Sequence, residues 1–162
     1  MENNMNISEN KPERKKVIFS GIQPTSGAFT LGNYLGAVKN WGLLQDEYNC
    51  TYCIVNQHAI TVRQDPKELK NNTLSAYALM LACGIDPQKT MIFTHSSVPA
   101  LNQLMLPFLS LVSESELERN PTVKAEQEAS GHALTGLLLT YPVHQACDIL
   151  FCKGNVVPVG KD

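Results

Sequence analysis

The stretch FSGIQPTSGAFTLGNYLG, from Phe19 to Gly36, decides the fold. The apolar run VIFS leads into it and is typical of a short buried strand. A loop rich in Gly, Pro, Ser and Thr follows, and from Gly32-Asn33 onward apolar residues recur at helical spacing. The stretch therefore predicts a strand, a loop and a helix in succession, which is the first half of a β–α–β unit.

The same alternation continues along the chain. Apolar and β-branched segments predict strands at residues 15–21, 50–58, 90–96 and 155–162. Helical periodicity predicts helices at residues 33–48, 65–84, 98–113, 115–131 and 132–151, with interruptions at Pro121 and Pro142. Because strands that alternate with helices form parallel sheets, we expect an α/β fold with a Rossmann-like parallel sheet and flanking helices.

Composition limits the class of protein. The chain has 162 residues and a net charge of −2, which fits one globular domain and argues against a strongly basic nucleic-acid surface. Residues 1–15 form a polar tail with both charge signs, which we expect to be disordered. The tail lacks the apolar core of a signal peptide, and no apolar run reaches membrane-spanning length. A cytoplasmic protein is expected.

The cysteines favour buried, reduced thiols. There are five, an odd number, and they lie inside apolar runs. Cys50 and Cys53 have a spacing seen in metal sites, but residues three apart on a strand point to opposite faces of the sheet. No protein metal site is therefore predicted.

Ligands of open parallel sheets bind at the carboxyl ends of the strands, where the strand order reverses. Four groups of polar residues are expected at these ends: Ser20–Gln23, Asn56–His58, Thr94–His95 and Gly160–Asp162.

The loop before the first helix has the chemistry of a phosphate cradle. Unpaired N–H groups and the positive end of the dipole lie at a helix N-terminus. Gly32 would let a phosphate approach, and Thr30 and Asn33 offer short polar side chains beside it. Gly21 and Gly27 would permit sharp turning. A purely structural glycine-rich turn explains the same residues equally well.

Several blocks together resemble a known family. PTSGAFTLGNYLGA is similar to the HIGH-region signature of class I aminoacyl-tRNA synthetases in its T-x-G-N form. The blocks FSGIQP, IVNQHAITVRQDP, LACGIDP, ELERNPTVK, LLLTYPVHQACDIL and NVVPVGKD follow the order of tryptophanyl-tRNA synthetases. The resemblance covers residues 16–162, with PTSG one residue longer than the loop of many members. It implies the amino-terminal portion of a catalytic domain with an incomplete nucleotide-binding fold.

The resemblance implies ATP-dependent activation of L-tryptophan and its transfer to tRNA(Trp), with Mg²⁺ bound to the nucleotide. Gln23, Thr30, Gly32 and Asn33 would carry the reaction by holding phosphates and ribose. The residues implied in binding ATP are Gly21, Gln23, Pro24, Thr25, Thr30, Gly32, Asn33, Gly160, Lys161 and Asp162. The family's KMSKS signature and its anticodon-binding part do not occur in these residues. The resemblance also implies a homodimer, to which the apolar segment 98–112 could contribute.

The resemblance assigns the tryptophan pocket as well. Asp148 would accept the indole N–H, which explains an acid between apolar neighbours on a helix. Tyr141 and Gln145 share its helical face and would contact the amino end and the ring. The other implied pocket residues are Phe19, His58, Val157 and Val159.

Two alternatives remain at this point. YPVHQACD also fits the Y-x-x-x-Q-x-x-D pattern of tyrosyl-tRNA synthetases, and His144-Gln145 stands where many bacterial tryptophan enzymes have Leu-Met. The helix alone could serve either ring, whereas the other blocks favour tryptophan. The chain could otherwise be a catalytically feeble module that binds tryptophan or ATP or forms dimers.

Overall fold

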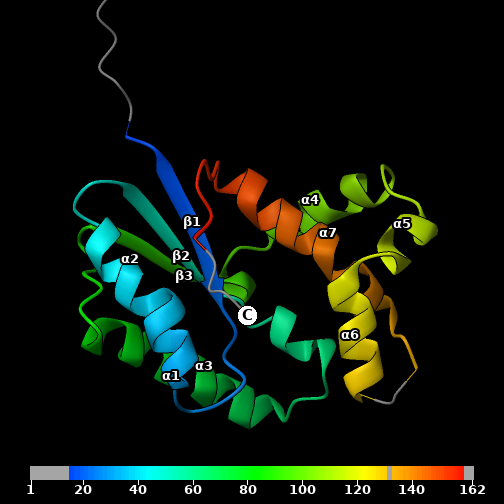
Figure 1. Ribbon diagram of the computed structural model, residues 1–162, viewed down its shortest axis with the longest axis horizontal. Coiled ribbons are helices and arrows are strands. Elements are labelled where there is room, and N and C mark those ends of the chain that lie inside the picture. The colour runs from blue at the N-terminus through cyan, green and yellow to red at the C-terminus, as the bar shows by residue number, and fades with distance from the viewer. Residues whose placement is uncertain (1–14, 131–132, 159–162) are drawn as a thin grey trace, which may run out of the picture.

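Three parallel strands form the sheet of the protein, whose computed structural model describes residues 15–130 and 133–158 (Figure 1). Strand β1 (Val17–Ile22) pairs with β2 (Asn49–Ile54), and β2 pairs with β3 (Thr90–Thr94). The strand order is β1-β2-β3. The predicted α/β fold with a parallel sheet is confirmed.

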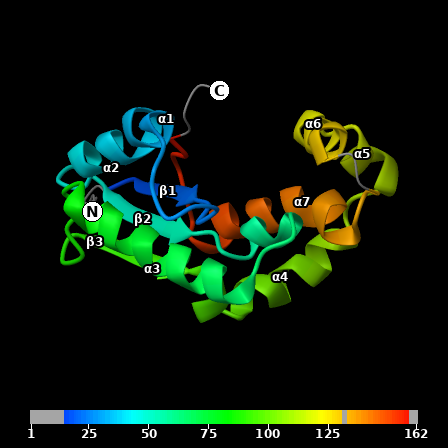
Figure 2. The same ribbon diagram turned by 90° about the horizontal axis from the view of Figure 1, so that it is seen from below.

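Helical segments connect and extend the strands. They are α1 (Leu31–Asn33), the π-helical turn η1 (Tyr34–Val38), α2 (Lys39–Leu44), the 3₁₀ turn η2 (His58–Thr61), α3 (Pro66–Ala82), the 3₁₀ turn η3 (His95–Ser97), α4 (Ala100–Leu109), α5 (Glu114–Glu118), α6 (Pro121–Ser130) and α7 (Gly136–Phe151). In both views α7 runs from the sheet toward α6, and α4 lies along it (Figures 1 and 2).

The two prolines act differently from one another. Pro121 begins α6, so the predicted interruption there is correct. Pro142 lies inside α7, which continues through it, so the division predicted at this residue is wrong. Leu138 on one side and Val143 and Cys147 on the other are all buried. Their packing holds the helix together although the proline removes one backbone hydrogen bond.

One face of the sheet carries the larger apolar core. Val38 and Trp41 from η1 and α2, with Met80 from α3, pack against the strands. The Trp41 ring stacks on Tyr52 of β2 with ring centroids 4.4 Å apart, and the Tyr52 hydroxyl donates to the Trp41 carbonyl at 3.1 Å. This face anchors the strands whose ends build the site.

The opposite face packs against the end of α7. Phe19, Cys53 and Val55 form its core, and Ile149 and Cys152 pack on them. Cys50 belongs to the first core and Cys53 to the second. The two thiols therefore lie on opposite faces of β2, as the sequence predicts.

After α7 the chain returns beside β1. Val156 forms an isolated parallel bridge with Ile18, and the Phe19 N–H donates to the Val156 carbonyl at 3.0 Å. In the described residues the strand predicted at 155–162 is therefore limited to this bridge. The returning segment lies on the side of β1 away from β2, so the strand order reverses beside β1.

No helix in the described part of the chain is both long enough and apolar enough to cross a membrane.

Candidate active site

A cavity of about 310 Å³ opens where the strand order reverses. Its walls come from the end of β1, from η2, from α6, from α7 and from the returning segment. The lining residues are Phe19, Ser20, Gly21, Gln23, Val55, His58, Thr122, Glu126, Tyr141, Gln145, Asp148, Ile149 and Val157. The location is the one expected for a ligand of an open parallel sheet.

Many of the residues predicted for tryptophan binding meet in this cavity. They are Phe19, His58, Tyr141, Gln145, Asp148 and Val157, and Gln23, which was predicted for the nucleotide, lines it too. Their roles remain predictions. Val159, Gly160, Lys161 and Asp162 lie outside the described residues.

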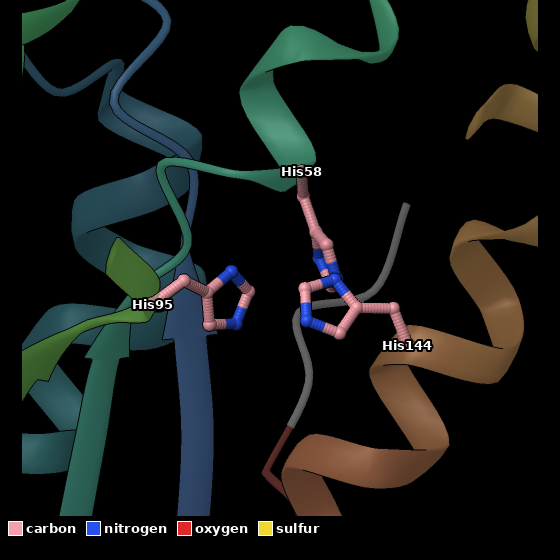
Figure 3. A group of neighbouring side chains, drawn as sticks. All are labelled: His58, His95 and His144. Atoms are coloured by element: carbon pink, nitrogen blue, oxygen red, sulfur yellow. The ribbon is translucent and has the colours of Figure 1, made fainter. Parts of the chain in front are cut away.

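Asp148 is the buried acid of the cavity, and its surroundings differ from the expectation. The sequence suggests a lone carboxylate among apolar residues, whereas three histidines lie beside it. Figure 3 shows how the three rings lie relative to one another. His95 Nε2 lies 2.9 Å from Asp148 Oδ2, and His58 Nε2 lies 3.5 Å from the same oxygen. His144 Nε2 lies 3.9 Å from Oδ1. Asp148 is 1% exposed, and its Oδ1 has no hydrogen-bond partner.

Three separate elements supply the histidines, which is why spacing alone does not reveal them. His58 opens η2 after β2, His95 follows β3, and His144 precedes Asp148 by one turn of α7 (Figure 3). The first two lie at the strand ends where polar residues were expected. The i,i+4 spacing of His144 and Asp148 was the remaining signal available in the sequence.

Burial keeps two of the imidazoles neutral. Burial, with smaller contributions from His95 and His144, lowers the pKa of His58 to about 3. Burial also lowers the pKa of His144, and the charge of Asp148 opposes part of that change. The contacts of these two histidines with Asp148 are therefore not ion pairs at neutral pH.

Helix α6 adds two polar lining residues that the sequence reading missed. Burial and, less strongly, the charge of Glu126 raise the pKa of Tyr141, and Thr122 forms a hydrogen bond with its hydroxyl. Thr122 lies in the block ELERNPTVK and Glu126 just after it, but spacing does not place either one at the cavity, because α6 reaches the cavity only through the fold.

The loop after β1 differs from its predicted shape. Gly21 lies inside β1, and a Cβ at this position would come within 2.8 Å of Val55 Cγ1. Gly21 is extended, so the sharp turning predicted there is wrong, whereas Gly27 lies in a bend of the loop. Gly21 instead permits close packing of β1 against Val55. Pro24 is buried and Thr25 is exposed.

The start of α1 is an exposed helix N-terminus held by a capping box. Thr30 Oγ1 accepts from the Asn33 N–H at 3.1 Å, and Asn33 Oδ1 accepts from the Thr30 N–H at 3.1 Å. Gly32 is exposed beside them. The N–H groups of Leu31 and Gly32 belong to the first turn, where no carbonyl of the helix itself can pair with them. The cavity is not lined by Thr30, Gly32 or Asn33. These residues form a separate polar site at the start of α1.

Comparison with known proteins identifies the family of the chain. The family described as "tRNA synthetases class I (W and Y)" matches residues 10–162. The tryptophan–tRNA ligase of Clostridium tetani is 48% identical over 153 residues, which are 94% of this chain and 45% of that protein. The chain thus spans about half the length of the relatives that it matches.

Solved structures of class I synthetases share the fold of the chain. The tryptophanyl-tRNA synthetase of Campylobacter jejuni, complexed with ADP and tryptophan, is similar with a TM-score of 0.82 and 37% identity. The match covers 90% of this chain and 45% of that one. A tyrosyl-tRNA synthetase of Archaeoglobus fulgidus has a TM-score of 0.73 at 17% identity, which shows likeness of fold alone.

Proposed function

Because the chain belongs to the class I tRNA synthetase family of the tryptophan and tyrosine enzymes, we propose that it activates L-tryptophan with ATP as the amino-terminal part of a tryptophan–tRNA ligase. Residues 16–162 would form the first half of the catalytic domain, and residues 1–15 a polar tail. The product, tryptophanyl-adenylate, would pass its tryptophanyl group to tRNA(Trp).

One observation carries the choice of substrate. Asp148 Oδ1 is a buried acceptor without a partner at the wall of a half-apolar cavity. An unpaired buried acceptor is costly, and the indole N–H is a donor on an otherwise apolar ring. Phe19, Val55 and Val157 supply apolar walls for such a ring. A phenylalanine side chain would leave Asp148 unpaired, so it would be rejected by chemistry as well as by shape.

The polar end of the amino acid has partners in the same cavity. Glu126 is the acidic lining residue besides Asp148 among those described, and it can attract the ammonium group. The Tyr141 hydroxyl and the Gln145 amide can hydrogen-bond to the same end. Gln23, which directly follows β1, lines the same cavity and begins the loop that leads to α1.

The nucleotide would bind over that loop. The exposed N–H groups at the start of α1 and the side chains of Thr30 and Asn33 fit the phosphates of ATP. Gly32 leaves the backbone accessible. In the proposed reaction the tryptophan carboxylate attacks the α-phosphorus and pyrophosphate leaves, so the protein acts by positioning and charge stabilisation. Mg²⁺ bound to the nucleotide would neutralise phosphate charge, and the terminal adenosine of the tRNA would then take the tryptophanyl group.

Self-association is proposed for an apolar surface on the other side of α7. Leu106 and Leu111 are each 74% exposed, and Leu150 is 59% exposed. Leu111 and Leu150 line a groove together with Phe108 and Val143. This surface includes part of the apolar segment 98–112 and would form the interface of a homodimer. A cytoplasmic location is part of the same proposal.

The proposal is tested by tryptophan-dependent exchange of pyrophosphate into ATP, measured on this chain and on a version extended past Asp162. We expect exchange to require tryptophan and to be faster in the extended protein. Exchange that responds to tyrosine and not to tryptophan would contradict the choice of substrate. Tryptophan binding without any exchange in either protein would point to a binding module.

A further inference from the structure

The histidine cluster behind the cavity leaves several polar atoms unpaired. His58, His95, His144 and Asp148 are exposed by 6%, 0%, 3% and 1%. Two ring nitrogens beside Asp148, His58 Nε2 and His144 Nε2, are buried without a hydrogen-bond partner. Buried polar groups nearly always have partners, so two unpaired nitrogens beside one buried carboxylate suit a bound ligand.

The geometry points to a divalent transition-metal ion of the zinc class, bound by His58, His95, His144 and Asp148. Each histidine offers a ring nitrogen, and these ligand atoms lie within 4.8 Å of one another. The three rings converge from η2, from the end of β3 and from α7 (Figure 3). Their centroids are 4.7 Å, 4.7 Å and 5.0 Å apart.

The distances to the carboxylate suit a tetrahedral site. With bonds of about 2.0–2.2 Å, the ligand atoms around zinc lie roughly 3.3–3.5 Å from each other. Nε2 of His95 and Nε2 of His58 lie 2.9 and 3.5 Å from Asp148 Oδ2, and Nε2 of His144 lies 3.9 Å from Oδ1. The ring nitrogens lie within 4.8 Å of one another, so they would move closer by up to about 1.5 Å to reach one ion. The ion would lie between His95 Nε2 and Asp148 Oδ2, and Oδ1 of Asp148 would stay available to the indole N–H.

The ligand chemistry selects the kind of ion. Neutral imidazoles and one carboxylate suit zinc and neighbouring transition metals, whereas Mg²⁺ prefers oxygen ligands and keeps its water. The cluster is therefore distinct from any site for the magnesium of ATP. Four protein ligands leave no open position, which is typical of a structural site. The ion would tie together η2, β3 and α7, which build the cavity. This departs from the expectation of no metal site.

The test is a metal titration of the chain freed of metal with a chelator, with neither tryptophan nor ATP present. We expect calorimetry to show one Zn²⁺ per chain and the melting temperature to rise. Co²⁺ should give the visible bands of a tetrahedral site without an intense near-ultraviolet thiolate band. An absence of binding would overturn the proposal, because water would then fill the cluster. The result is separate from that of the exchange assay.

Variants decide which side chains bind the ion. His144→Gln and His95→Gln should each weaken Zn²⁺ binding by more than about 10-fold. Cys83→Ser is the matched control, because Cys83 is a partly exposed thiol that packs on the other face of the sheet. The Cys83→Ser variant should bind Zn²⁺ with the affinity of the parent protein. Unchanged binding in His144→Gln, or lost binding in Cys83→Ser, would overturn the assignment. If the fully buried His95→Gln variant does not fold, His144→Gln decides alone.

Discussion

Replacing Asp148 by Asn should selectively weaken the binding of ligands that carry the indole N–H. The Asp148→Asn variant keeps the shape of the side chain and an oxygen that can accept from His95. The substitution removes the negative charge of this acceptor. The Asp148 side chain is buried, with 1% of it exposed. A hydrogen bond to a charged group contributes about 1.5–3 kcal/mol. At about 1.4 kcal/mol per tenfold change, tryptophan should bind roughly 10- to 150-fold more weakly.

The assay compares two ligands by calorimetry, with a chelator present so that no metal contributes. One is tryptophan, and the other is its benzothiophene analogue, which has sulfur in place of the N–H. Asp148→Asn should weaken the binding of tryptophan far more than the binding of the analogue. Glu118→Gln removes an exposed carboxylate from α5 and should change the affinity for neither ligand. An equal loss for both ligands would refute the reasoning, because it would mean that Asp148 acts on the fold of the cavity and not on the N–H.

Three further predictions concern stability. Gly21→Ala should lower the free energy of unfolding, measured in urea, by about 1–3 kcal/mol, because the new Cβ would meet Val55 Cγ1 at 2.8 Å. Gly136→Ala is the control and should not lower it, because a Cβ there would have no atom within 4 Å. Equal effects of the two substitutions would contradict this reasoning. Asp65→Ala should cost about 0.5–2 kcal/mol, because Asp65 caps α3 by accepting from two backbone N–H groups, and an unchanged urea midpoint would argue against the cap. The pKa of Glu116 is lowered by its hydrogen bonds with Ser113, so its contribution to stability is present above the usual value of 4.5 and is lost as the pH falls through the lower folded value. The melting temperature of Glu116→Gln, plotted against pH, should lack this part of the pH dependence. If the plots for Glu116→Gln and for the parent protein run parallel, the prediction is contradicted.

Local sequence signals predict most of the fold. The alternation of strands and helices gives the parallel sheet, and the spacing of Cys50 and Cys53 places them on opposite faces. Asp65 and Pro66 mark the start of α3, and Gly84 adopts a positive φ just after its end. These features depend on residues close together in the chain, so their pattern is visible without the structure.

Features that depend on tertiary packing are not visible in this way. Pro142 breaks the local rule because buried neighbours on both sides hold α7 together. Of the strand predicted at 155–162 the structure describes residues 155–158, which form one bridge with β1.

The site shows the same limit. The family resemblance selects Asp148 and several residues that do share its cavity. The surroundings of Asp148 were foreseeable only in part. The sequence places His58 and His95 at strand ends and His144 one turn before Asp148, but their meeting at one point depends on the folded protein. Glu126 reaches the cavity in the same way, through the packing of α6.

The central claim is that Asp148 receives the indole of tryptophan in the cavity beside β1. A crystal structure of this chain with bound tryptophan tests it most directly. The account predicts the indole nitrogen about 2.7–3.2 Å from a carboxylate oxygen of Asp148, with the amino end toward Tyr141 and Glu126. An indole ring that lies outside this cavity, or one whose nitrogen faces another group, would contradict the account.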